Sequence, residues 1–209
     1  MQKITSIITT FFLSAAFAGM AQTVDTEALK PFDASTVRAT YEVCRHVSLT
    51  PEQQVKLAKQ IERENVDFLK EISKNSGFLS AKANKKLQKA HDAALADILD
   101  GEQLEQYYRG VYNAEALAEG NGIADRLQKQ YSLTDQNWKF IRNAFYRIGL
   151  DTRVLKKTMA SNPKAQAAEI KRRRSAQLQE IEDRGGIRVN PDMTVTVVRP
   201  FDPNSLRKE

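Results

Sequence analysis

Histidine and cysteine, which often serve as metal ligands, acid–base groups or nucleophiles, are scarce in this chain. Its 209 residues include two histidines, His46 and His91, and one cysteine, Cys44. Cys44 and His46 are two residues apart, a spacing that points two side chains of a helix toward different faces. His91 has no second ligand four residues away, and the chain has no cluster of Cys and His. We therefore expect no metal site, no cofactor, and a structural role for His91.

Cys44 leaves three interpretations open. It is the only cysteine, so it forms no disulfide within the chain and packing must stabilise the fold. It is a small buried hydrophobic residue, one half of a disulfide between two chains, or part of a thiol site with His46.

No arrangement typical of an enzyme is present in the sequence. The chain has no Ser-His-acid or Cys-His order with supporting turn motifs, and no Gly-rich loop follows an expected strand. The Asp and Glu residues occur at helical surface spacings with Lys and Arg partners, which is typical of solvated helix faces. We expect a protein that is not an enzyme.

The densest charge is the run Lys171-Arg172-Arg173-Arg174. Four consecutive residues cover all sides of a helix, so Arg174 falls on the apolar side between Ile170 and Leu178. One interpretation is a solvated face from which Arg174 extends its charged end to water. The other is a basic patch that attracts acidic segments of a partner protein. The preceding helix would add Arg142, Arg147 and Arg153 to that patch.

The helices that position these residues begin at a repeated pentapeptide. Leu49-Thr50-Pro51-Glu52-Gln53 recurs as Leu99-Asp100-Gly101-Glu102-Gln103 and as Leu133-Thr134-Asp135-Gln136-Asn137. In the first copy Thr50 is the expected N-cap, Pro51 occupies the first helical position, and Gln53 reaches back to the amide of the cap. A single copy predicts only a helix start, so the order of the copies carries the information.

Apolar residues at three- and four-residue steps predict an all-α fold. The first helix is expected from Ser35, as its cap, to Val47. The other expected helices are 50–74, 80–98, one from the second motif copy toward 117, 123–131, one from the third copy to 159, and 163–184. Short turns at 75–77 and 161–163 predict two antiparallel hairpins. Glu119-Gly120-Asn121-Gly122 predicts a break between the halves.

The two expected hairpins resemble one another. At an offset of 84 residues, Leu49, Thr50 and Ile61 align with Leu133, Thr134 and Phe145. Any two amphipathic helices can be aligned on their apolar sides, so the matching suggests an internal duplication without establishing one.

The C-terminal part has a different character. Residues 187–189 and 194–198, separated by a turn at Asn190-Pro191-Asp192, predict two short strands. An isolated hairpin is marginally stable in water, so this one either docks on the helices or remains a mobile tail. Pro200 and Pro203 favour disorder beyond Phe201.

Residues 1–21 are typical of a secretory signal peptide, with Lys3 before an apolar core and Gly19-Met20-Ala21 as a cleavage site. Cleavage near Ala21 would leave 188 residues and lower the formal charge from +6 to +5. Mixed charges of this kind favour acidic surfaces in general, and not nucleic acid. No later segment reaches the roughly 18 to 20 apolar residues of a membrane span.

With these residues in view, the chain resembles the Spy/CpxP family of periplasmic stress proteins, which LTxxQ motifs define. The likeness is clearest over residues 49–110, where a motif, a helical hairpin and a second motif, Ile98-Leu99-Asp100-Gly101-Glu102-Gln103, follow in order. The part from Leu133 is similar at its start, but Glu182-Asp183-Arg184-Gly185-Gly186 stands where a closing motif is expected. Asp100 and Asn137 also depart from the motif.

The resemblance implies a cradle of long helices, usually formed by two chains. Its concave basic face would bind unfolded or partly folded envelope proteins without ATP, and some relatives bind heavy metals. We therefore expect a periplasmic protein with helical units at 22–120 and 121–186 and a tail at 187–209. It would be a monomer that carries both halves of a cradle, or a homodimer. The alternatives in function are a chaperone, an adaptor with one dedicated envelope partner, and a metal-sensing relative.

Overall fold

The computed structural model describes residues 24–74 and 77–198 of the chain. The expected signal peptide at 1–21 and the expected disorder beyond Phe201 lie outside these residues. Within them the helices are α1 (Ala34–Cys44), α2 (Pro51–Lys74), α3 (Ala81–Ile98), α4 (Gly101–Tyr131), α5 (Asp135–Thr158) and α6 (Pro163–Gly185), followed by the strands β1 (Ile187–Val189) and β2 (Val195–Val197). The predicted all-α fold with a short C-terminal β-hairpin is confirmed.

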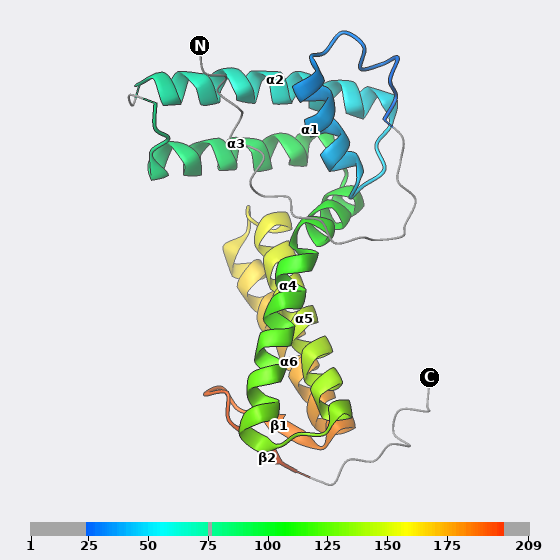
Figure 1. The fold of residues 1–209 in the computed structure, drawn as a ribbon, viewed down its shortest axis with the longest axis vertical. Helices are drawn as coiled ribbons and strands as arrows, with labels where there is room; N and C mark the ends of the chain where they lie inside the picture. The colour runs from blue at the N-terminus through cyan, green and yellow to red at the C-terminus, as the bar shows by residue number, and fades with distance from the viewer. Residues whose placement is uncertain (1–23, 75–76, 199–209) are drawn as a thin grey trace.

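The helices form two parts that meet at the start of α4 (Figure 1). Helices α2 and α3 form an antiparallel hairpin, here called the arm, which lies across one end of the molecule. Helices α4, α5 and α6 run alongside one another as a three-helix bundle, and the β-hairpin lies at the end of the bundle far from the arm. The two predicted hairpins, α2–α3 and α5–α6, therefore lie in different orientations (Figure 1).

Helix α1 packs on α2 next to the junction with α4. Its N-cap is Asp33, and not Ser35 as predicted, because the Asp33 carboxylate accepts hydrogen bonds from the amides of Ser35 (2.8 Å) and Thr36 (2.9 Å). An aspartate two residues upstream of a serine competes for the same cap, and the charged acceptor makes the stronger bond. The Ser35 hydroxyl also donates to Asp33, and this hydrogen bond has the largest effect in lowering the pKa of Asp33; the backbone hydrogen bonds lower it further.

Two hydrophobic cores hold the chain together. The first lies at the junction, where Leu57 and Leu95 of the arm pack with Tyr107 of α4 and Val154 of α5. Asp92 of α3 also accepts hydrogen bonds there from the Tyr108 hydroxyl (2.8 Å) and from Lys157. The second core lies in the bundle, and its buried members are Ala124, Leu127, Ile141, Ala144, Phe145, Ile181, Ile187 and Val189.

The β-hairpin docks on the bundle through β1. The strands pair antiparallel, with Ile187 opposite Val197 and Val189 opposite Val195. Ile187 and Val189 are buried, whereas Val197 on β2 is 70% exposed. Of the two sequence-based alternatives, the described part of the tail is the docked one.

Helix α4 continues through residues 119–122, so the helix break predicted there is wrong. Gly120 is buried, and a Cβ atom built on it would lie 2.7 Å from the Arg142 carbonyl oxygen and 2.9 Å from the Tyr146 amide nitrogen of α5. The glycine therefore lets the backbones of α4 and α5 approach closely. Packing between the helices outweighs the low helix propensity of two glycines.

None of the helices in the described ranges is long and apolar enough to cross a bilayer.

The two glycines in this stretch provide a matched pair of substitutions. Gly120→Ala should lower the free energy of unfolding by about 2 kcal/mol, because the new methyl group meets backbone atoms that cannot move aside. Gly122→Ala should raise it by about 0.5–1 kcal/mol, because nothing lies within 4 Å of the new Cβ and alanine favours the helix. Urea denaturation followed by circular dichroism measures both. Equal effects of the two substitutions would contradict the close approach of α4 and α5.

Candidate functional site

The first two copies of the pentapeptide bind each other. Gln53 donates from Nε2 to the Gln103 Oε1 atom (2.7 Å) and to the Ile98 carbonyl oxygen (3.0 Å). Gln103 donates in the same way to the Gln53 Oε1 atom (3.1 Å) and to the Ser48 carbonyl oxygen (2.8 Å). Ser48 and Ile98 each precede the leucine of their own motif, so the two copies are related by an approximate two-fold symmetry. We call this arrangement the glutamine clamp.

Each glutamine in the clamp also closes its own helix start. The Gln53 Oε1 atom accepts from the Thr50 amide (3.0 Å), and the Thr50 hydroxyl accepts from the Gln53 amide (3.2 Å). Gln103 and Asp100 make the same pair of bonds at 3.1 and 2.8 Å. The capping boxes expected from the sequence are therefore present, but the contact between the two motifs was not foreseen. The spacing of residues in the sequence cannot predict this contact, because it forms only when the α2–α3 hairpin brings the start of α4 next to the start of α2.

The third copy of the pentapeptide has a cap but no clamp. The Thr134 hydroxyl accepts from the Asn137 amide (3.2 Å). Asn137 is buried, and its side-chain oxygen has no hydrogen-bond partner among the described residues. It faces Gly185 at the end of α6, in the region where a closing motif is missing. An asparagine is one methylene shorter than a glutamine, so it cannot reach back to its cap and across to a partner together.

The outer part of the arm has exposed apolar side chains. Val66 and Leu69 of α2 are 50% and 58% exposed, and Phe78, beside the turn, is 77% exposed. Glu64 and Glu71 point toward α3, where they contact His91 (2.8 Å) and Lys86 (3.8 Å). Residues two apart on a helix project in roughly opposite directions. Val66 and Leu69 therefore lie on the side of α2 that faces away from α3.

Both helices of the arm carry exposed lysines. The first half of α3 has Lys82, Lys85, Lys86 and Lys89, all exposed, with no acidic residue between Leu79 and His91. On α2, a shallow hollow that contains Val66 is lined by Lys59, Glu62, Arg63, Asp67 and Lys70. The arm thus combines exposed apolar groups with a basic face. The amino-acid sequence does not reveal this surface, because Leu69 also fits the apolar periodicity of α2.

The basic residues predicted to form one patch lie on two sides of α5. Arg147 pairs with Glu180 of α6 (3.2 Å), whereas Arg153 pairs with Glu115 (2.8 Å) and Glu119 (2.7 Å) of α4. Arg142 stacks over the Trp138 ring at 5.3 Å. The Trp138 indole donates to Asp125 of α4 (2.7 Å), so this stack also lies on the α4 side.

The Lys171–Arg174 run is partly engaged in ion pairs within α6 and with α5. Arg172 and Arg173 donate to the Glu169 carboxylate at 2.6–2.8 Å. These hydrogen bonds lower the pKa of Glu169 to about 2, and those from Arg172 have the largest effect. Arg173 also lies 3.7 Å from Asp151, which pairs with Arg109 of α4 (3.0 Å). Lys171 and Arg174 are exposed. Arg173 is therefore the member of the run that connects α6 to α5.

His91 lies in the arm, whereas His46 and Cys44 lie at the junction. His91 bridges the arm through Glu64, and His46 lies half-buried against Tyr107, where burial, followed by the charge of Arg45, lowers its pKa. Cys44 is buried in the junction core, and burial raises the pKa of its thiol to about 11. Among the described residues no group of three or more His, Cys, Asp or Glu could hold a metal ion.

No protein-family model, curated protein or solved structure that was compared with the chain matches it. The function must therefore be argued from the residues themselves.

The clamp predicts an energetic coupling between two helix starts. Gln53→Ala should lower the free energy of unfolding by about 1–2 kcal/mol, because it removes the hydrogen bonds of Gln53 to the Ile98 carbonyl and to the Gln103 side chain. Thr50→Ala removes only the cap and should cost about 1 kcal/mol. In a double-mutant cycle, Gln53→Ala and Gln103→Ala should show a coupling of about 1 kcal/mol. Gln106→Ala, at an exposed position one turn further along α4, is the control. Strict additivity of the two clamp substitutions would contradict the contact.

Cys44 should resist thiol reagents in the folded protein. Burial and a raised pKa leave little accessible thiolate, so labelling by a maleimide at mildly alkaline pH should be slower by orders of magnitude than in denaturant. Labelling kinetics followed by mass spectrometry measure this difference. Rapid labelling of the native chain, or a disulfide-linked dimer on a non-reducing gel, would favour the alternatives of a reactive or intermolecular thiol.

Proposed function

We propose that this protein is an exported, ATP-independent chaperone that binds unfolded or partly folded envelope proteins. The observation that supports the proposal is the outer arm, where Val66, Leu69 and Phe78 are exposed and both helices carry exposed lysines. Exposed apolar groups gathered on one element are typical of protein-binding surfaces. We assign client binding to the arm first. We assign it second to Arg142, Arg147 and Lys171–Arg173, because these residues do not form one patch and ion pairs engage most of them.

The two kinds of side chain would have different roles. Lysines that attract acidic segments accelerate encounter, and this effect weakens as salt is added. The apolar groups would then hold the client, because burying each of them removes apolar area from water. Few residues of the outer arm are buried, so its side chains can adjust to unrelated sequences. A surface of this kind would bind many clients weakly.

The motif layout supports the same function. Motif, hairpin and motif follow in the order that characterises the Spy/CpxP proteins, which this chain resembles, and the glutamine clamp joins the two motifs. A periplasmic location would follow from the proposed signal peptide. The proposal includes two alternatives for the active form, a monomer with both hairpins and a homodimer.

A second candidate is an adaptor with one dedicated envelope partner. The observation that favours it is β2 at the edge of a two-stranded sheet, where Val197 is 70% exposed and Val198, directly after the strand, is 46% exposed. An extended segment of a partner could add to this edge by main-chain hydrogen bonds. Deleting residues 187–209 would not test this candidate, because Ile187 and Val189 belong to the bundle core.

Paired substitutions distinguish the chaperone from the adaptor. Leu69→Ser with Phe78→Ser should raise the amount of protein needed for half-suppression of aggregation by about tenfold, as expected when apolar anchors are lost. Val197→Ser with Val198→Ser should leave suppression unchanged. Light scattering on two unrelated aggregating proteins is the measurement. Unchanged suppression by the arm variant would contradict the proposal, and loss of one dominant partner in the β2 variant would favour the adaptor.

A further inference from the structure

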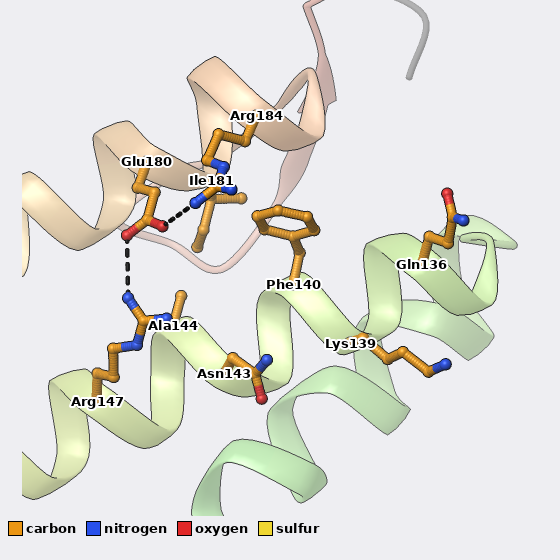
Figure 2. Close-up of a pocket in the computed structure, with 9 residues that line it drawn as sticks. All are labelled: Gln136, Lys139, Phe140, Asn143, Ala144, Arg147, Glu180, Ile181 and Arg184. Atoms are coloured by element: carbon orange, nitrogen blue, oxygen red, sulfur yellow. Dashed lines mark hydrogen bonds and ion pairs between the residues drawn. The ribbon is translucent and has the colours of Figure 1, made fainter. Parts of the chain in front are cut away.

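A groove of about 410 Å³ lies between α5 and α6, in the bundle and away from the arm. Ala144 and Ile181 are buried at its base, and half-buried Phe140 stands between the two helices, as Figure 2 shows. On the α6 side, Arg184 lies over the Phe140 ring at 5.6 Å and donates to Glu180 (3.1 Å). The groove thus has an apolar base and a charged rim.

The α5 rim of the groove has three hydrogen-bond donors in a row. Lys139, Asn143 and Arg147 line the groove at four-residue steps, so they lie along one side of α5. Arg147 is 49% exposed and donates to Glu180, which uses only part of the five N–H groups of a guanidinium. Lys139 is exposed and has no ion pair among the described residues. Both cations therefore keep donors for an anionic partner.

The spacing of the two cations indicates which partner would fit. Eight residues of helix separate Lys139 from Arg147 by about 12 Å along the axis. An extended peptide covers about 13 Å in four residues and places the first and fifth side chains on the same side. Carboxylates at these two positions would meet Lys139 and Arg147, and an apolar residue midway between them would lie over Phe140 and Ala144.

We propose that this groove binds an extended segment of a partner protein in which two acidic residues, four positions apart, flank an apolar residue. The site is separate from the arm and does not rest on the chaperone proposal. Charge complementarity carries the choice of occupant, since the α5 rim offers cations and an amide, and the only carboxylate lining the groove is Glu180. An apolar segment without acidic residues would leave these donors unmatched.

A labelled peptide with the order Asp-Ser-Phe-Ser-Asp between glycines tests the proposal by fluorescence anisotropy on the full chain. Binding should weaken as salt is added, and it should be lost when both aspartates are replaced by asparagine. Arg147→Gln and Lys139→Gln should each weaken binding by up to about fivefold. Arg126→Gln, which changes an exposed arginine of α4 outside the groove and outside the client-binding residues, is the matched control and should have no effect.

Several outcomes would overturn this assignment. Equal binding of the asparagine peptide, or an equal loss in Arg126→Gln, would mean that the groove does not select the segment. Absence of binding at millimolar peptide would do the same. Binding that emerges only after residues 199–209 are removed would make the chain's own Phe201-Asp202 the occupant. A dimer in sedimentation that Arg147→Gln dissociates would identify a second copy instead.

Discussion

The reciprocal contact between Gln53 and Gln103 is the interaction on which the arrangement of the arm depends. Each amide closes its own helix start, satisfies the carbonyl that precedes the other motif, and pairs with the other amide. The motif leucines, Leu49 and Leu99, are buried beside it. One polar contact therefore sets where α2 begins, where α3 ends and where α4 begins. Because all three are defined at one point, the outer arm can extend from the molecule without a large core of its own.

Close helix packing then connects the arm to the rest of the chain. Helix α4 begins at the clamp and runs unbroken into the bundle, where Gly120 lets α5 approach its backbone. The junction core includes Leu150 and Val154 of α5 as well as residues of the arm. Asp92, which accepts from Tyr108 and Lys157, adds a polar contact at the same place. The direction of the arm relative to the bundle is thus determined by α4 and by the core around it.

The charges of the molecule divide into those that hold helices together and those that face water. Asp151 lies between arginines of α4 and α6, and Glu169 binds two arginines of its own helix. Ion pairs that are this exposed add little stability, but they reduce the field of the basic run. The lysines of α3 have few such partners, so the arm keeps much of its positive charge. Function is therefore better argued from charge left after pairing than from the density of charge along the chain.

The amino-acid sequence by itself determined most of the helices and their starts, because capping and apolar periodicity are local properties. Thr50, Asp100 and Thr134 cap as expected, and the β-hairpin follows α6 as predicted. Only the tertiary structure decided what depends on distant partners. Gly120 and Gly122 favour a break locally, yet Gly120 serves a close approach to α5 that its neighbours cannot indicate. Gln53 forms a hydrogen bond with Gln103, 50 residues further along the chain. Carboxylates on another turn of α6 and on α5 neutralise part of the charge of the basic run. Contacts of this kind exist only once the chain has folded back on itself.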